Sequence, residues 1–228
     1  MYTTTNSVPV ITIDGPSGTG KGTIAALVAQ HLGWHLLDSG ALYRGLAYAA
    51  LQQTLVLADE AAITALADQI ELQLQGEHLL LNGAEISTQI RSEAVGTAAS
   101  QIAAYPGVRA RLLDWQRAAA QPPGLVADGR DMGSVVFPQA PLKLFLDASP
   151  EERAQRRYKQ LKDKGVDANL SKLTEELCAR DARDRGRAHS PLAVASGALV
   201  FDTTQFTIDE VFARVIAAIT QAGLDSAP

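Results

Sequence analysis

The chain has 228 residues, enough for one sizeable α/β domain with an insertion and short for two full domains. Its single cysteine, Cys178, excludes an internal disulfide and a multi-cysteine zinc site, and its net charge of −5 argues against general binding to nucleic acid. No apolar run reaches the ~18 residues that a membrane helix needs, and residues 1–7 lack the pattern of a signal peptide. We therefore expect a cytoplasmic monomer that binds neither nucleic acid nor membranes.

An apolar, β-branched run from Val8 to Ile13 predicts a buried strand that ends on Asp14. Four glycines follow within eight residues, with Lys21 among them, and from there the apolar residues recur with a helical period. Strand, glycine loop, lysine and helix form the P-loop arrangement, in which backbone N–H groups surround a phosphate and the lysine adds a full charge. A plain glycine-rich turn is the alternative, and the lysine and the hydroxyl of Thr23 count against it.

The loop departs from the common motif because Gly22 stands between Lys21 and Thr23, where Ser or Thr usually follows the lysine directly. The Lys-Gly-Thr ending resembles nucleoside-monophosphate kinases more than GTPases, and no Asn-Lys-x-Asp segment for reading guanine occurs. We expect the loop to bind ATP, through Gly15, Pro16, Ser17, Gly18, Thr19, Gly20, Lys21, Gly22 and Thr23.

A second strand that ends in a polar turn follows the first helix. Trp34–Leu37 predicts the strand, Asp38–Gly40 the turn, and the apolar residues after it a helix. Such a strand beside a P-loop belongs to a parallel sheet, whose carboxyl edge binds ligands. Arg44, one turn into the helix, is placed to reach a second phosphate; the alternative is an exposed surface arginine.

Residues 60–92 depart from the alternation of strand and helix that precedes them. Apolar and polar residues alternate from Ile70 to Gln75, and Asn82-Gly83 separates two further short apolar runs, which is a strong signal for a type I′ hairpin. We expect a small antiparallel insertion on the parallel core. It is either a cover for the substrate or a purely structural addition, and we favour the cover.

Two helices, from Arg91 to Ala104 and from Val108 to Ala120, lead to another buried strand. Leu125–Ala127 predicts this strand, and the segment Asp128-Gly-Arg-Asp-Met-Gly133 follows at its end. An acid that closes a strand suits the aspartate that orients Mg²⁺ or its water shell in P-loop enzymes. The alternative is a polar strand end without chemistry.

The segment 151–190 holds 11 of the 20 lysines and arginines, so we expect it to meet an anion. A buried strand, Pro141–Asp147, precedes it, and Ser149-Pro-Glu-Glu152 predicts a complete capping box at the start of a helix. That helix places three arginines on one side, and a polar, mobile loop follows over 159–169. The three arginines are Arg153, Arg156 and Arg157.

A second charged helix continues through Arg187, and on it Arg180, Asp184 and Arg187 share a face at i, i+4 and i+7. A charge-rich helix is usually solvated, but beside a P-loop two arginines on one stripe form a bidentate phosphate clamp. The chain then predicts a short strand, Ala198–Phe201, and an amphipathic helix, Ile208–Ala222.

Four segments together resemble the bacterial cytidylate kinase family: Gly15–Thr23, Leu37–Arg44, Ala127–Gly133 and Arg180–Arg187. The resemblance runs in order from about Val8 to Ala222. It implies one α/β kinase domain over 1–228 with the P-loop kinase fold, a parallel sheet flanked by helices. It also implies that the antiparallel insertion, about 60–92, covers the nucleoside monophosphate and that a helical lid spans about 153–187. Thr19 stands where the family often has Ala, which leaves its backbone role intact.

The resemblance also implies roles for individual residues. Lys21, Asp128, Arg130 and Arg187 are the implied catalytic residues, and Arg157 is an implied lid arginine over ATP. Mg²⁺ is implied to bind through ATP, with Thr23 and Asp128 acting through water. Ser100, Arg109 and Asp131 resemble the group that reads cytosine. The implied substrate-binding residues are Ser39, Arg44, Ser100, Arg109, Arg130, Asp131, Arg180, Asp184 and Arg187.

We therefore expect transfer of the γ-phosphoryl group of ATP to CMP or dCMP, with Mg²⁺. Phosphoryl transfer needs two anions held in line and their charge neutralised, which suits a chain with many placed arginines. A uridylate, shikimate or dephospho-coenzyme A kinase is one alternative. A non-catalytic ATP-binding regulator is another, and the arginines of a second anion site count against it.

Overall fold

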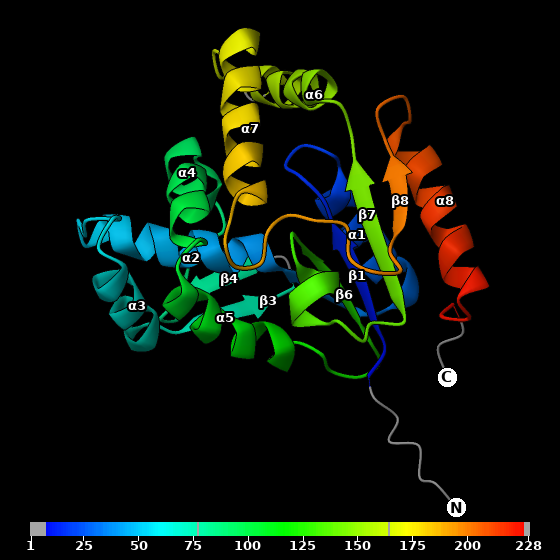
Figure 1. Cartoon of the computed structure of the whole chain (residues 1–228), viewed down its shortest axis with the longest axis horizontal. Helices are drawn as coiled ribbons and strands as arrows, with labels where there is room; N and C mark the ends of the chain where they lie inside the picture. The colour runs from blue at the N-terminus through cyan, green and yellow to red at the C-terminus, as the bar shows by residue number, and fades with distance from the viewer. Residues whose placement is uncertain (1–7, 77, 164, 226–228) are drawn as a thin grey trace, which may run out of the picture.

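A five-stranded parallel sheet organises the computed structural model, which describes residues 8–76, 78–163 and 165–225. The strands lie in the order β2-β6-β1-β7-β8. Figure 1 labels β6, β1, β7 and β8 of this sheet. Every residue of β1 and β6 is buried, as expected for a parallel sheet covered on both faces, and apart from Thr12, Asp14 and Asp128 these strands are without polar side chains. The strands are β1 (Val10–Asp14), β2 (His35–Asp38), β6 (Leu125–Gly129), β7 (Leu142–Asp147) and β8 (Leu199–Asp202).

Helices cover both faces of this sheet (Figure 1). Ile11 and Ile13 of β1 point into a core shared with α1 (Lys21–Leu32) and α8 (Ile208–Gln221). Val10 points into the opposite core, against helices from the first half of the chain. Those helices are α2 (Ser39–Gln52), α3 (Glu60–Gln69), α4 (Glu93–Ile102) and α5 (Pro106–Ala118). No helix of the described residues is long and apolar enough to cross a membrane.

The predicted antiparallel insertion is present and begins later than expected. Residues 60–69 form α3, capped by the side chain of Asp59, and only then do β3 (Leu72–Gln75), β4 (His78–Leu81) and β5 (Ala84–Glu85) form a three-stranded antiparallel sheet. Asn82 and Gly83 have φ of 50° and 82°, so the predicted type I′ turn is confirmed. The insertion packs tightly on α2, since a Cβ added to Gly45 would lie 2.8 Å from the side chains of Leu72 and Leu79.

Two helices, α6 (Pro150–Asp163) and α7 (Leu170–Arg185), stand together beyond the carboxyl end of β7 (Figure 1). They correspond to the predicted lid, with two corrections. The connection predicted over 159–169 is shorter, because α6 continues to Asp163. Helix α7 ends at Arg185, so Arg187 follows the helix instead of lying on its face.

The capping box predicted at the start of α6 is only half formed. The N–H of Glu152 donates to Ser149 Oγ at 3.2 Å, but the side chain of Glu152 accepts from Arg156 Nε at 2.9 Å instead of returning to the backbone. The N–H of Ser149 donates to Thr204 Oγ1 at 3.1 Å. A tertiary partner from beyond β8 has therefore replaced the local one. A complete capping box lies at the start of α8, between Thr207 and Glu210.

The glycine loop approaches β7 so closely at Gly15 that a larger residue there should destabilise the fold. Gly15 has a φ of +149°, and an added Cβ would lie 2.0 Å from the carbonyl oxygen of Leu146. We expect Gly15→Ala to lower the free energy of unfolding by more than about 3 kcal/mol, because both the strain and the backbone clash must be relieved. Gly33→Ala is the control: its φ is +66° with open space around it, so strain alone should cost about 1 kcal/mol. Equal losses in chemical denaturation would contradict this account.

Candidate active site

The glycine loop connects β1 to α1 at the carboxyl edge of the sheet. Gly18 and Gly20 have φ of 84° and 88°, a conformation that suits glycine, and Lys21 is the buried first residue of α1. Lys21 Nζ lies 3.8 Å from Asp128 Oδ1 and donates to the carbonyl oxygen of Pro16 at 3.4 Å. Burial and the nearby Arg130 lower the pKa of Lys21 to about 8. A buried ammonium at a helix N-terminus favours an anion in front of it.

Asp128 closes β6 beside this lysine. A Cβ added to Gly22 would lie 3.2 Å from Asp128 Oδ2, so a glycine after Lys21 lets the carboxylate approach the loop. This contact gives a physical reason for the Lys-Gly-Thr ending. Burial raises the pKa of Asp128, against the lowering effect of Lys21. Asp128 Oδ1 is buried and has no hydrogen-bond partner among the described residues, so it can accept one from a water shell.

Arg130 joins the glycine loop to the next group of charges. Its Nη2 donates to Ser17 Oγ at 2.7 Å, and its Nε donates to Asp184 Oδ2 at 3.1 Å. Ser17 belongs to the loop, whereas Asp184 lies on α7, so one guanidinium spans two parts of the site. Arginine suits this place because its planar fork presents donors in fixed directions.

Asp184 lies at the centre of the second group and is only 1% exposed. Besides Arg130, it accepts from Arg187 Nη2 and, at 3.3 Å, from Ser100 Oγ. Burial raises the pKa of Asp184, but Arg130, Arg187 and Arg180 outweigh it and hold the pKa below its ordinary value. The shared helical face predicted for Arg187 is wrong, because Arg187 lies outside α7, yet Arg187 still pairs with Asp184.

Arg44 and Arg180 are two further arginines near Arg130 and Arg187, and we call these four residues the arginine cluster. Arg44 Nη2 pairs with Asp38 Oδ2 at 2.9 Å, which holds it beside the carboxyl end of β2. Burial, Arg130 and, to a smaller extent, Arg44 lower the pKa of Arg180 to about 10, and its Nε has no hydrogen-bond partner among the described residues. Partly buried guanidinium groups that repel one another favour a bound anion.

Arg109 and Asp131 form a separate ion pair. Arg109 on α5 donates to Asp131 through Nη2 and to the carbonyl oxygen of Ala103 through Nη1 at 3.1 Å. Its guanidinium also lies over the ring of Tyr43. Burial raises the pKa of Asp131, against the lowering effect of Arg109. The carboxylate that pairs with Arg130 is Asp184.

Asp14 is a buried acid whose role the sequence did not reveal. Its two carboxylate oxygens accept from the N–H groups of Met132, at 2.9 Å, and Gly133, at 2.8 Å. These two residues begin a short π-helix, Met132–Val136, directly after Asp131. Asp14 therefore anchors the turn that presents Arg130 and Asp131. An acid that closes an otherwise apolar strand was the only available signal.

Two arginines of α6 contact the glycine loop. Arg153 Nη1 donates to the carbonyl oxygen of Ser17 at 3.0 Å, and Arg156 Nη1 to that of Thr19 at 3.3 Å. Arg157, the predicted ATP contact, pairs with Glu93 at the start of α4. The three arginines expected on one side therefore reach different partners. Their common helical face in the sequence does not distinguish them.

The sequence model of the cytidylate kinase family, whose description is "Cytidylate kinase", matches residues 11–221. The chain belongs to the cytidylate kinase family. It is 58% identical over 217 residues to the cytidylate kinase of Aeromonas salmonicida, covering 93% of this chain and 94% of that relative. It is 54% identical over 222 residues to the cytidylate kinase of Pseudomonas syringae pv. syringae, covering 95% and 97%. The predicted family and kinase activity are confirmed.

A solved structure of an uncharacterized protein from Eubacterium ventriosum is similar in fold, with a TM-score of 0.52 at 11% identity. The match covers 93% of this chain and 98% of that one. Identity this low shows a common fold alone. Together with the parallel sheet and the glycine loop between β1 and α1, it agrees with the predicted P-loop kinase fold.

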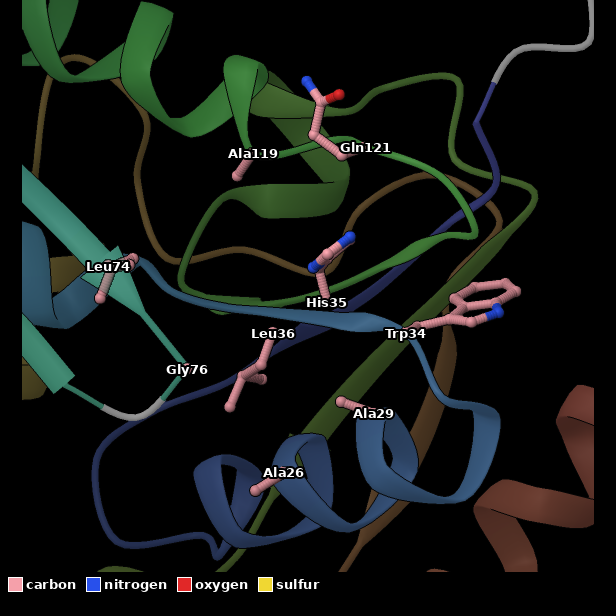
Figure 2. Close-up of a pocket in the computed structure, with 9 residues that line it drawn as sticks. All are labelled: Ala26, Ala29, Trp34, His35, Leu36, Leu74, Gly76, Ala119 and Gln121. Atoms are coloured by element: carbon pink, nitrogen blue, oxygen red, sulfur yellow. The ribbon is translucent and has the colours of Figure 1, made fainter.

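Figure 2 shows a cavity of about 430 Å³ that is separate from this site. Ala26 and Ala29 of α1, Leu36 of β2 and Leu74 of β3 contribute apolar side chains to it, and His35 lines it beside the carbonyl oxygen of Pro122. No charged group of the glycine loop or of the arginine cluster lines it. A cytidylate kinase needs cations at its phosphates, so this cavity is not the active site.

The buried carboxyl of Asp14 makes the stability of this cytidylate kinase depend on pH. Burial raises the pKa of Asp14 from 3.8 to about 7, so the folded protein keeps a proton that the unfolded chain releases between these values. The stabilisation is full below the unfolded pKa and is lost as the pH rises through the folded one. Relative to Asp14→Asn, the wild type should lose about 1 kcal/mol of unfolding free energy per pH unit between pH ~5 and ~7. Urea titrations across this range measure it, and a constant difference would contradict it.

Proposed function

We propose that this kinase transfers the γ-phosphoryl group of ATP to CMP and dCMP, giving CDP and dCDP. The observation that supports this most is the contact between Arg130 Nη2 and Ser17 Oγ at 2.7 Å. The contact joins the glycine loop to a second group of partly buried arginines, which supports a pair of neighbouring anion sites. A non-catalytic ATP-binding regulator needs only the first of these two sites.

The reaction needs positioning and charge neutralisation more than covalent help from the protein. In our proposal the loop amides and Lys21 hold the ATP phosphates, and Arg44, Arg130 and Arg187 hold the phosphate of the acceptor. The acceptor oxygen attacks the γ-phosphorus, and the bond to the β-phosphate oxygen breaks, leaving ADP. Lys21 and Arg130 lie on the two sides of this transfer and stabilise the charge that spreads over the equatorial oxygens.

Mg²⁺ is part of the proposal, and the residues at the loop fit it. Asp128 offers a buried carboxylate oxygen without a hydrogen-bond partner among the described residues, and Thr23 is exposed one turn into α1. No cluster of three or more His, Cys, Asp or Glu that could hold a metal occurs in the described part of the chain, so ATP itself would supply ligands. The ion would neutralise phosphate charge while Asp128 and Thr23 orient its water shell.

Base recognition is assigned to Ser100, Arg109 and Asp131. Arg109 pairs with Asp131, whereas Ser100 donates to Asp184. Cytosine offers an exocyclic amine that donates hydrogen bonds, and a ring nitrogen and carbonyl that accept them. A carboxylate at Asp131 would accept from the amine, and Arg109 would donate to the acceptors. Uracil presents a carbonyl in place of the amine, so the same carboxylate would repel it. Arg180 and Asp184 are assigned to the pentose, and Ser39 to the substrate side.

We also propose that α6 and α7 act as a lid and residues 60–92 as a cover on the monophosphate side. The insertion packs on α2, the helix that carries Arg44, which supports the second assignment. A lid that closes would exclude water, which otherwise accepts the phosphoryl group. One chain supplies both anion sites, which supports a monomer, and the cytoplasm is the proposed location.

An ADP-release assay across possible acceptors tests the proposed function. With ATP and Mg²⁺, CMP and dCMP should give the highest kcat/KM, and UMP should be used less well because of the carboxylate. AMP and shikimate should give little turnover. Preference for UMP or shikimate would favour the alternative kinases, and ATP binding without transfer to any acceptor would favour a regulator.

The Arg109–Asp131 pair predicts how the base is selected. Asp131→Ala should lower kcat/KM for CMP by the equivalent of about 2–4 kcal/mol and affect UMP much less, because only cytosine loses a hydrogen bond to a charged acceptor. Steady-state kinetics with both nucleotides on the folded variant measure this difference.

Asp38→Asn is the matched control for the base prediction. Asp38 also holds an arginine, Arg44, but at the phosphate side, and asparagine keeps the oxygen that caps α2. CMP and UMP carry the same phosphate, so this variant should affect both equally. Parallel losses in Asp131→Ala as well would leave Asp131 as a support for Arg109 without a role in base selection.

A further inference from the structure

Ser17 of the glycine loop accepts hydrogen bonds from two arginines that belong to different parts of the chain. Its Oγ accepts from Arg130, and its carbonyl oxygen accepts from Arg153 Nη1 at 3.0 Å. Arg130 lies on the acceptor side of the site, whereas Arg153 lies on α6 of the lid. We propose that Arg153 is a positioning residue that sets Arg130 through Ser17, an inference that rests on the proposed function.

Helix α7 connects the same two arginines from the other side. Arg153 Nη2 pairs with Asp181 Oδ2 at 2.6 Å, and Arg130 Nε pairs with Asp184 Oδ2 at 3.1 Å. The two aspartates are three residues apart on α7 and so project from one face of it. Asp181, Arg153, Ser17, Arg130 and Asp184 therefore form a closed path, which we call the Ser17 ring. Any shift of α7 acts on both arginines at once.

Burial keeps the Ser17 ring in one arrangement. Arg153 is 2% exposed, and its third nitrogen, Nε, donates to the carbonyl oxygen of Ala148 at 3.0 Å. A Cβ added to Gly18 would lie 3.0 Å from Arg153 Cβ, so the glycine loop packs directly on α6. A buried guanidinium with every nitrogen bonded loses all of these contacts if it moves, and they are strong where water is absent.

The bonds of Arg153 also explain why it acts through Ser17. All three of its nitrogens already bond to protein groups, Ala148, Ser17 and Asp181, so it is not placed to bind either nucleotide. Its effect on the acceptor must pass through the loop to Arg130. A movement of α6 would thereby change the position of Arg130, and Ser17 of the glycine loop would connect the two.

A double-mutant cycle on Ser17 and Arg153 tests the Ser17 ring. Ser17→Ala removes the Oγ that holds Arg130 and keeps the carbonyl, and Arg153→Lys keeps the charge but makes fewer of the three bonds. Each should lower kcat/KM for CMP by about tenfold, the scale of one hydrogen bond to a charged group. The KM for ATP should change less. The kcat/KM for CMP of the double variant should be little lower than that of the more affected single variant, because both substitutions break the same connection between Arg153 and Arg130.

Independent losses that multiply, or an Arg153→Lys enzyme with normal CMP kinetics, would overturn the proposal. A purely structural role would lower the melting temperature and affect both substrates alike, so thermal unfolding is measured on every variant. Lys172→Met is the control, because it removes an exposed ion pair with Glu176 on the same helix and should change neither measurement. A wild-type enzyme that does not phosphorylate CMP would refute the proposed function instead.

If Arg153→Lys does not fold, the double variant Arg153→Met/Asp181→Leu takes its place in the cycle. Removing both members of a buried ion pair avoids an uncompensated charge and commonly preserves stability. This protein should fold, lack the bond to Ser17 and show the same loss in kcat/KM for CMP. Normal CMP kinetics in a folded protein of this kind would overturn the proposal.

Discussion

The constraint on which the rest of the structure depends is the burial of several cations at one edge of a parallel sheet. Lys21, Arg130 and Arg180 lie close enough for Arg130 to lower the pKa values of the other two, and burial lowers them further. An isolated charge in such a place would be too costly to keep. Carboxylates at strand ends and on α7 offset part of this cost. A nucleotide phosphate would supply the remaining negative charge.

The parallel sheet explains how these charges come together from distant parts of the chain. Parallel strands end at one edge, so Asp14, Asp38 and Asp128 arrive there from three separate segments. Each then acts on a different partner: Asp14 on backbone N–H groups, Asp38 on Arg44, and Asp128 beside Lys21. The fold thus converts strand ends that look alike in the sequence into three separate functions.

Local patterns in the sequence predicted those parts of the structure that depend on neighbours along the chain. The glycine loop, the period of α1 and the Asn82-Gly83 turn all follow from short-range conformational preferences. The capping box at Ser149 failed for the opposite reason. Thr204, 55 residues further along the chain, took the place of the local partner. Local preference decides only where no tertiary partner competes with it.

The side-chain partners in the site depend on how helices and strands pack together, which the spacing of residues along the sequence does not reveal. Arg153 and Arg157 share one helix, yet Arg153 is buried against the glycine loop and Arg157 meets Glu93 near the surface. Which of them touches the loop depends on the angle at which α6 leaves β7. Spacing did not pair Asp131 with Arg109 either, and only the family resemblance grouped them, because α5 and the segment after β6 meet only in the folded chain.

The carboxylates beside the site arginines also stabilise these cations when no substrate is bound. Each arginine of the proposed clamp, Arg44, Arg130 and Arg187, has a protein carboxylate beside it, so these cations are already oriented and would not need to reorganise around a phosphate. Asp184 holds Arg130 and Arg187 together through hydrogen bonds from both. A stronger set of internal carboxylates would stabilise the fold further but would compete with the substrate phosphate. Arg180, whose Nε lacks a partner among the described residues, shows that the compensation stops short of complete. The N–H at Arg180 Nε would be available to a bound nucleotide.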